Sequence, residues 1–279
     1  MSAGTVTVIM PALHAAATIV DAVDSVRDQD YADWELVIVA DDLCDYASLL
    51  PRDPRLICLR TAKPRSGPAA ARNVGLARGL QPFVTFLDSD DVWYRDKLSR
   101  LVPRAQEWGI ALDNVRFRAA SGQGPEGVYW DAPRAGHHEP SFLAAVSQSL
   151  WPVFRREVVG PLRFSEDLDF AEDAVFNLAL IARNAGAYLH PQPLHEQRLR
   201  HDTLSRSVTA VRRAGDAYDR ILAALQDGTD RSFAAAQRPW AMDVFRRRQA
   251  LNQAFAMSEA LWFEAFEVAC RAAPDAAAG

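Results

Sequence analysis

Residues 84–91 read Val-Thr-Phe-Leu-Asp-Ser-Asp-Asp, and this segment constrains the fold of the chain more than any other. Its apolar first half predicts a buried strand, and three carboxylates follow at Asp88, Asp90 and Asp91. Open α/β sheets bind ligands beyond the carboxyl ends of their strands, and clustered Asp oxygens suit a hard cation such as Mg²⁺ or Mn²⁺. A solvated turn or a helix N-cap is the alternative for such a motif taken alone.

Strands alternate with helices over about the first 95 residues, as periodicity and breakers indicate. We expect strands at 5–10, 34–40, 55–60 and from 83, with helices at 14–28 and 69–79. Pro11 is expected to end the first strand. Such alternation predicts βαβ units and therefore an α/β fold with a mostly parallel, doubly wound central sheet.

The middle of the chain predicts a hairpin, in which residues 115–118 pair with 128–130. Gly122, Gly124 and Gly127 between them match G-x-G-x-x-G literally. Pro125 interrupts the match and a strand follows it, so no helix N-terminus is available for a pyrophosphate. These glycines therefore indicate a turn. A helix is expected at 171–184, and the chain after residue 206 reads as largely helical.

The C-terminal segment carries an apolar stripe with spacings of four and seven, which predicts one straight amphipathic helix. Its members are Trp240, Val244, Leu251, Phe255, Trp262 and Phe266. The stripe can pack on the rest of the chain, form a dimer seam or lie on a membrane. Arginines at 246–248 suit anionic headgroups, whereas glutamates at 259, 264 and 267 are repelled by them. We therefore expect packing against the main domain or a second subunit.

Composition narrows the function classes. The chain has 279 residues and a formal charge of −5, from 31 basic and 36 acidic residues, which argues against nucleic-acid binding. Three cysteines are odd in number and lack metal-ligand spacing, so a reducing compartment is expected. Neither a signal peptide nor a run of the ~20 apolar residues that span a bilayer is present in the sequence. We expect a cytoplasmic protein without a transmembrane span, with room for peripheral contact at the inner face of a membrane.

Several motifs occur in one order along the chain. They are Met10-Pro11, Asp41-Asp42, the loop 67–75 (GPAAARNVG), the turn 88–91, Glu172-Asp173, and His201 with Ser205. This order resembles the inverting family 2 glycosyltransferases, which have a single-domain A-type nucleotide-sugar-binding fold. The resemblance covers roughly residues 5–207. It implies a catalytic domain at 1–207, with a nucleotide-binding half at about 1–99 and an acceptor-binding half at about 100–207, and a helical extension at 208–279.

The resemblance implies a role for each matching residue. Binding of a nucleoside-diphosphate sugar, with UDP as the expected nucleotide, falls to Pro11, Leu13, Asp41, Asp42, Arg72, Asn73, Asp88, Ser89 and Asp90. Mn²⁺ or Mg²⁺ would be held by Asp90 and Asp88 and would neutralise the leaving diphosphate, and His201 would either ligate the metal with them or hydrogen-bond the diphosphate. Asp173 is the expected general base for the acceptor hydroxyl, and Glu172 its neighbour in acceptor binding. The acceptor would be a glycan or a lipid-linked saccharide.

Some positions leave alternatives open. The family usually reads Asp-Asp-Gly-Ser where this chain reads Ala40-Asp41-Asp42-Leu43, so the base that is recognised is not defined. Arg72 can pair with phosphate or tie its helix to the Asp turn. Asp91 is expected to be structural, or to cap a helix that starts near Tyr94.

Rival functions are a catalytically inactive nucleotide-sugar-binding or scaffold protein and a sugar-phosphate nucleotidyltransferase. The latter class has a Gly-rich phosphate loop with Arg and Lys after the first strand, and residues 11–15 have neither feature. An EF-hand is excluded because its sixth loop position requires Gly, and Trp93 stands there. The sequence does not identify the sugar, the acceptor or the oligomeric state.

Overall fold

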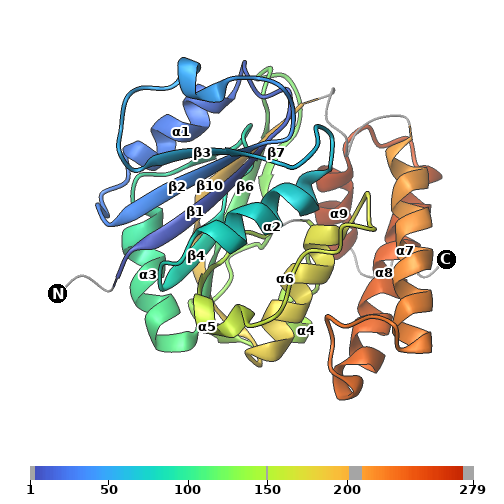
Figure 1. Cartoon of the computed structure of the whole chain (residues 1–279). Helices are drawn as coiled ribbons and strands as arrows, with labels where there is room; N and C mark the ends of the chain where they lie inside the picture. The colour runs from blue at the N-terminus through green and yellow to red at the C-terminus, as the bar shows by residue number, and fades with distance from the viewer. Residues whose placement is uncertain (1–3, 149, 201–208, 273–279) are drawn as a thin grey trace.

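A mixed ten-stranded sheet forms the centre of the protein in the computed structural model, which describes residues 4–148, 150–200 and 209–272 (Figure 1). The strands are β1 (Val6–Ala12), β2 (Trp34–Ala40), β3 (Leu56–Arg60), β4 (Phe83–Phe86), β5 (Val92–Trp93), β6 (Ile110–Ala119), β7 (Glu126–Val128), β8 (Gly136–His138), β9 (Val153–Arg155) and β10 (Ala187–Leu199). The helices are α1 (Ile19–Arg27), α2 (Pro68–Arg78), α3 (Lys97–Trp108), α4 (Pro140–Leu143), α5 (Arg156–Val159), α6 (Glu172–Arg183), α7 (Ala210–Asp227), α8 (Arg238–Ala256) and α9 (Phe263–Ala272).

The sheet order is β3-β2-β1-β4-β9-β6-β10-β5, with β7 paired to β6 and β8 to β10. The first four strands of this order are parallel, as the βαβ pattern predicts. Beyond β4 the sheet is mixed, because β9 runs antiparallel to both of its neighbours while β6 and β10 are parallel. The predicted α/β class is confirmed, with the parallel part concentrated in the N-terminal half.

The first strand continues through Pro11, contrary to the prediction. Ile9 accepts a hydrogen bond from the amide of Leu87, so the backbone of every second residue of β1 points toward β4. β4 ends at Phe86, which is opposite Ile9. The missing N–H of Pro11 therefore points past the end of β4, where no ladder partner is lost. The following helix is also shorter than predicted and begins at Ile19.

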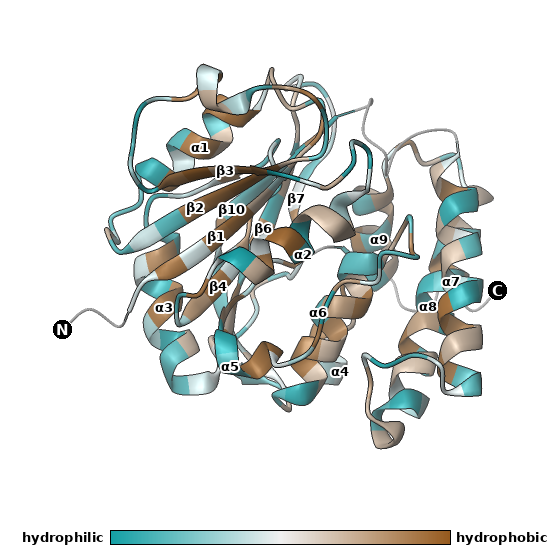
Figure 2. Cartoon of the chain, viewed as in Figure 1, coloured by the Kyte–Doolittle hydropathy of each residue, from teal (hydrophilic) through white to brown (hydrophobic). Residues whose placement is uncertain are grey.

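Apolar side chains alternate between the two faces of the sheet and form two main clusters. One contains Val6, Val8 and Met10 of β1 together with buried residues of α1 and α3. The other contains Ile9 with residues of β4 and α6. Figure 2 shows the strongest apolar character on the strands and hydrophilic residues along the outer side of α7. Because helices cover both faces, the open edge at the carboxyl ends of β1, β2 and β4 is available for a ligand.

The C-terminal stripe does not form one straight helix, which corrects the prediction. α8 ends at Ala256 and α9 begins at Phe263. The hydroxyl of Ser258 donates to the carbonyl of Phe255 and accepts from the amide of Ala260, so the side chain ends the helix by competing for its backbone groups. The Phe255 ring then packs edge-to-face against Phe263, with centroids 5.3 Å apart.

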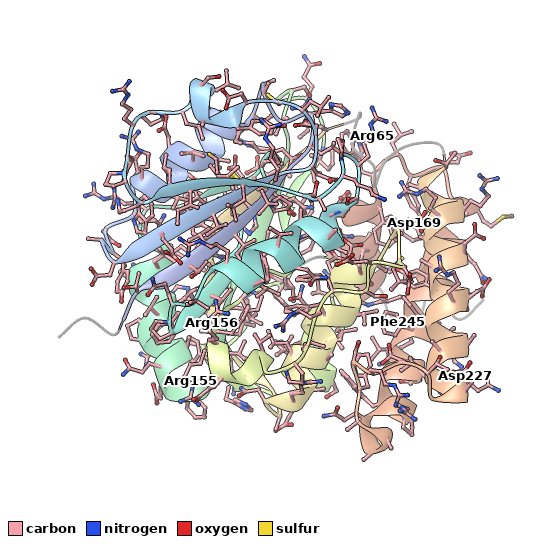
Figure 3. All side chains as sticks on the ribbon, in the orientation of Figure 1. Arg65, Arg155, Arg156, Asp169, Asp227 and Phe245 are labelled. Atoms are coloured by element: carbon pink, nitrogen blue, oxygen red, sulfur yellow. The ribbon has the colours of Figure 1, made fainter. Side chains whose placement is uncertain are left out.

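The helical extension packs onto the α/β domain. Val244 of the stripe and its neighbour Phe245 are fully buried and belong to the cluster that includes α6. Figure 3 shows Phe245 on α8 facing the main domain. The predicted packing of the stripe is confirmed for this part of it. The expected domain boundary after residue 207 falls in 201–208, outside the described residues. None of the helices described is both long and apolar enough to cross a bilayer.

Candidate active site

A cavity of about 730 Å³ lies at the carboxyl ends of β1, β2 and β4. It is lined by nine of the residues expected to bind donor, metal or acceptor: Pro11, Leu13, Asp41, Arg72, Asp88, Ser89, Asp90, Glu172 and Asp173. Elements far apart in the sequence meet here, since the strand-end residues come from the first half of the chain and the Glu172-Asp173 pair opens α6. The spatial grouping that the motif order predicts is therefore present.

Arg72 occupies the centre of this group. Its Nη1 donates to Oε1 of Glu172 at 2.9 Å, and its Nη2 donates to Oδ1 of Asp88 at 2.8 Å. The guanidinium lies 4.5 Å from the ring centroid of Trp151, whose Nε1 donates to the other oxygen of Asp88 at 3.0 Å. The structure shows the link from Arg72 to the Asp turn and extends it to α6, while the compatible role of Arg72 in pairing with phosphate stays a prediction.

The local sequence of α2 explains how Arg72 reaches this position. Gly67 adopts a positive φ of 95° and Pro68 occupies the first turn, which starts the helix abruptly. Gly75 lets the helix approach β1, because a Cβ at that residue would lie 2.3 Å from Cγ2 of Ile9. The close approach holds the first turn of α2 beside the end of β4, where Arg72 meets Asp88.

Asp90 lies in a partly buried and acidic environment. Burial, together with the nearby charges of Asp91 and Asp88, raises its pKa to about 7, and Arg200 offsets this in part. An anionic oxygen held among other carboxylates suits a divalent cation. Mg²⁺ typically takes one or two protein carboxylates and completes its shell with substrate phosphate and water. Within the described ranges no three His, Cys, Asp or Glu side chains are grouped as a metal site.

Asp91 has a structural role, as expected, but it does not cap a helix. α3 begins only at Lys97, and the residue that precedes it is Asp96. The buried carboxylate of Asp91 lies 2.9 Å from Nε2 of His195 and accepts the amide of Arg198 at 2.9 Å. These bonds fasten the acidic turn to β10, so that Arg198 and Arg200 line the same cavity as Asp90.

Glu172 and Asp173 lie in different environments although they are adjacent. Glu172 is 6% exposed, and burial together with the charge of Asp173 raises its pKa to about 7, while Arg72 lowers it. Asp173 is half-buried, and one of its oxygens accepts a hydrogen bond from the amide of Ala174 at 2.7 Å. Asp173 is therefore the more accessible of the two acids.

Tyr218 of α7 also lines the cavity, and burial with the charges of Asp173 and Glu267 raises its pKa to about 12.

Asp41 lines the cavity but is held by the protein's own groups, and two other expected site residues, Asp42 and Asn73, do not line it. Both oxygens of Asp41 bind the loop before α2, because they accept from Thr61, Ser66 and Gly67. Asp42 does not line the cavity, and accepts from the amides of His14 and Cys44 and the hydroxyl of Tyr46. Asn73 also lies outside the lining, where its amide pairs with the backbone of Phe164. Asp42 and Asn73 thus bind other parts of the protein, their expected role in donor binding stays a prediction, and His201 lies outside the described residues.

Sequence reasoning missed Trp151 and Tyr218, which no local motif marks.

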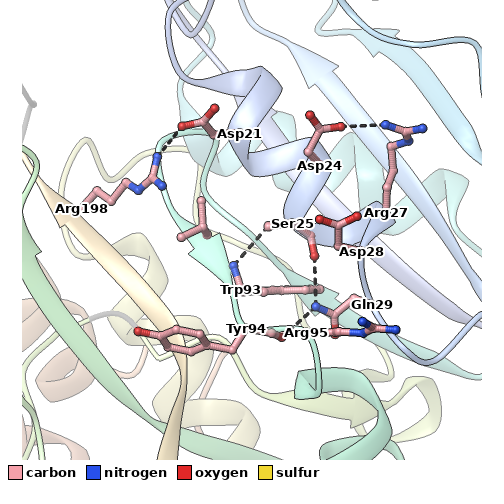
Figure 4. Close-up of a pocket in the computed structure, with 11 residues that line it drawn as sticks. Asp21, Asp24, Ser25, Arg27, Asp28, Gln29, Trp93, Tyr94, Arg95 and Arg198 are labelled. Atoms are coloured by element: carbon pink, nitrogen blue, oxygen red, sulfur yellow. Dashed lines mark hydrogen bonds and ion pairs between the residues drawn. The ribbon is translucent and has the colours of Figure 1, made fainter.

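A second hollow, of about 720 Å³, lies between α1 and β5, and its lining does not include Asp88, Asp90, Glu172 or Asp173 (Figure 4). Its polar side chains mostly bind one another: Ser25 accepts the amide of Trp93, and Arg198 pairs with Asp21 at 2.7 Å. These bonds join α1 to β5 and to Arg198 near the end of β10.

Comparison with known proteins agrees with this geometry. Over residues 7–128 the chain matches the model of glycosyl transferase family 2. The succinoglycan biosynthesis protein ExoO of Rhizobium meliloti is 27% identical over 219 residues, which are 72% of this chain and 62% of that protein. Escherichia coli WfgD, a UDP-Glc:alpha-D-GlcNAc-diphosphoundecaprenol beta-1,3-glucosyltransferase, is 40% identical over 95 residues, 33% of this chain and 38% of that protein.

Other relatives are longer, since the match with two glycosyltransferases of Rickettsia spans 31% and 30% of their lengths. Among solved structures, S. aureus TarS 1–349 in complex with UDP-GlcNAc superposes with a TM-score of 0.69. The likeness covers 88% of this chain and 72% of that one at 19% identity, so it shows the shared fold. The family match and the relatives thus show that the chain is similar to glycosyl transferase family 2, and the structural likeness shows that it shares the fold of TarS.

Proposed function

We propose that the protein transfers a sugar, with inversion, from a UDP-sugar to an acceptor hydroxyl in the synthesis of a polysaccharide or glycoconjugate. One observation carries the proposal. Arg72 joins Asp88, at the end of the donor-side strand, to Glu172, at the start of the helix that also carries Asp173. A nucleotide-binding edge and a candidate base thereby share one cavity, which is the arrangement that single displacement at an anomeric carbon requires.

The donor would lie along the ends of β1, β2 and β4, with Pro11 and Leu13 beside the nucleoside. Asp88 and Asp90 would hold a Mn²⁺ or Mg²⁺ ion with the diphosphate. The bound cation would supply Lewis-acid stabilisation of the leaving group. Arg200 lines the same cavity and adds positive charge near the phosphates. Because Asp41 is engaged by the loop before α2, recognition of the base by this residue would depend on its remaining lone pairs.

The acceptor would approach from the side of α6. Its hydroxyl oxygen forms a bond to the anomeric carbon as the bond from that carbon to the diphosphate oxygen breaks, and Asp173 takes the hydroxyl proton. Glu172 is the weaker candidate for the base, because Arg72 already binds one of its oxygens. It would orient the acceptor and hold Arg72 in place. The three cysteines are free thiols, which agrees with action in a reducing compartment such as the cytoplasm.

Two variants test the proposal. Asp90→Ala should weaken UDP binding in Mn²⁺ and leave the fold intact, as followed by calorimetry with metal and with chelator. Asp173→Asn should bind UDP as the parent does but lose transfer by about 10²–10⁴-fold, the usual contribution of a general base. A thermal-shift panel of nucleotide sugars with Mn²⁺ would supply the donor for this assay.

Equal UDP affinity in parent and Asp90→Ala would remove the metal site from the proposal. Near-parent transfer by Asp173→Asn would assign the base to Glu172 or another acid. A parent protein that binds UDP-sugars but neither transfers nor hydrolyses them would instead be an inactive binding protein.

A further inference from the structure

Two buried polar side chains of the helical extension line the active-site cavity. They are Tyr218 of α7 and Asn252 of α8, which are 5% and 7% exposed. Figure 1 shows these two helices side by side, next to α6, which carries Asp173 in its first turn. The family match ends at residue 128, so neither residue belongs to the segment that the family model covers.

The hydroxyl of Tyr218 has no hydrogen-bond partner among the residues that the structure describes. Buried polar groups in proteins usually have one. Some side-chain atoms of this chain lack a partner and are sealed from solvent, such as the amide atoms of Asn177, but the hydroxyl of Tyr218 is not among them. Its ring packs in the core against Phe245, with centroids 6.2 Å apart. The oxygen at the end of the ring therefore opens into the cavity that the side chain lines.

The side-chain oxygen of Asn252 is in the same situation. The nitrogen of this amide donates to the carbonyl of Val211 at 2.9 Å, so the oxygen of the amide points away from that carbonyl. In the described part of the chain Oδ1 accepts no hydrogen bond, and it is not among the atoms sealed from solvent. The extension thus presents one O–H donor and one carbonyl acceptor to the cavity, each on a side chain that is itself buried.

The charges around Tyr218 place it on the acceptor side of the cavity. Burial together with the charges of Asp173 and Glu267 raises its pKa to about 12, while Arg248 lowers it. The phenol therefore stays protonated near neutral pH and remains a donor. None of these three charged residues belongs to the strand ends, where the diphosphate of the donor would lie.

We propose that Tyr218 and Asn252 bind the acceptor sugar: the phenol donates a hydrogen bond to one of its oxygens, and the amide oxygen accepts one from another of its hydroxyls. The attacking hydroxyl of the same sugar gives its proton to Asp173, so the two groups of the extension meet the oxygens beside it. Both groups are uncharged, and a neutral donor with a neutral acceptor suits sugar hydroxyls. This assignment rests on the proposed function, since it concerns the acceptor side of the same cavity.

Tyr218→Phe tests the assignment, because it removes the hydroxyl and keeps the ring. The probes are methyl β-D-glucopyranoside and its monodeoxy analogues, and saturation-transfer NMR on the full chain measures their dissociation constants with UDP and Mn²⁺ present. The parent should bind at least one analogue about three- to tenfold more weakly than the complete sugar, as expected for the loss of one hydrogen bond. Tyr218→Phe should bind the complete sugar more weakly by the same factor. For that analogue the variant should lose nothing further, because the two changes remove the same bond.

Tyr31→Phe is the matched control. Tyr31 lies just before the amino end of β2 and does not line the cavity, and its hydroxyl donates to the carbonyl of Gly4 at 2.6 Å. This variant should melt about 1–4 °C below the parent, because it loses that bond, and should bind the glucoside as the parent does. Tyr218→Phe should show the reverse pattern, with the melting temperature of the parent and weaker binding of the glucoside. A role of Tyr218 in packing alone predicts no change in binding.

The proposal is wrong if the parent binds none of these glucosides, or if Tyr218→Phe binds them as the parent does. It is also wrong if Tyr218→Phe weakens the binding of UDP-glucose but not of UDP or the methyl glucoside, because the phenol then contacts the donor sugar. If the parent binds the methyl glucoside through Tyr218 but neither transfers nor hydrolyses UDP-sugars, the proposed function falls while the saccharide site stands. The two failures are thereby distinguishable.

Discussion

Replacement of Arg72 by Met should destabilise the protein by an amount that depends on pH. Arg72 is 5% exposed and is bonded to both Asp88 and Glu172. Removing one partner of a buried ion pair usually costs about 3–5 kcal/mol, because the other charge stays buried without compensation. Here Glu172 has a pKa raised to about 7 by burial and the charge of Asp173, so it can accept a proton instead.

The expected magnitude follows from that pKa. Near pH 6 Glu172 is largely protonated, and the variant loses mainly hydrogen bonds and the contact with Trp151, together about 2 kcal/mol. Loss of Arg72 raises the pKa of Glu172 further. Each pH unit above 7 then adds up to about 1.4 kcal/mol to the destabilisation of the variant, because its folded state has to keep the carboxyl of Glu172 protonated. The cost at pH 8 should therefore be about 3–3.5 kcal/mol.

Urea unfolding followed by circular dichroism at pH 6 and pH 8 measures both values. Arg55→Met is the matched control, since Arg55 also stacks on a Trp, 3.7 Å from the Trp34 ring, and pairs with Asp53 at 2.8 Å. Hydrogen bonding to Arg55 holds the pKa of Asp53 at about 2, so this cost should be the same at both pH values. An equal cost for Arg72→Met at pH 6 and pH 8 would refute the assignment of Glu172 as the proton acceptor.

Two other predictions use groups near the same cavity. Because burial and neighbouring acids raise the pKa of Asp90 to about 7 from 3.8, its protonated form stabilises the metal-free protein at low pH, and this is lost as pH rises toward 7. Between pH 4 and pH 8 the free energy of unfolding of Asp90→Asn should fall by about 1–3 kcal/mol less than that of the parent, after allowance for solvent screening, as measured by thermal melts in chelator. The same pH dependence of stability in variant and parent would contradict this. Gly75→Ala should destabilise the protein by about 1–3 kcal/mol, because the new Cβ would lie 2.3 Å from Cγ2 of Ile9. Its control, Gly215→Ala in α7, should stabilise the protein by about 0.5–1 kcal/mol, because the nearest atom to the new Cβ is 3.9 Å away. Stabilisation by both substitutions would show that α2 can move away from β1.

The strand-end acids could be predicted because they depend on local pattern and on one geometric rule. β2 and α2 form close to where periodicity places them, and parallel strands bring their carboxyl ends to one edge. That rule alone places Asp88 and Asp90 near Asp41. Whether an acid faces the cavity or the protein depends on distant partners. The carboxylate of Asp42 accepts hydrogen bonds from the amide of His14 and the hydroxyl of Tyr46, and the spacing of residues within the loop predicts neither bond.

β10 shows a second kind of limit. The strand contains Pro191 and Pro193, which oppose a strand assignment in any local reading. Its register with β6 shifts on either side of Pro193, so the prolines fall at irregular positions where ladder bonds are interrupted. The pairing of His195 with Asp91 depends on this strand, and therefore could not be anticipated. In the same way, the side chain of Ser258 divides a stripe whose spacing alone predicts a continuous helix.

The cavity thus joins two parts with different origins in the sequence. Asp88 lies within the segment that matches the family, whereas Glu172, Asp173 and the helical extension lie beyond it. Arg72 bonds to one acid from each part, so the donor edge and the start of α6 are held by one side chain. If the proposed function holds, substitutions of Asp88 or Asp90 at the strand ends should change donor binding, whereas substitution of Asp173 at the start of α6 should change transfer and leave donor binding as it is.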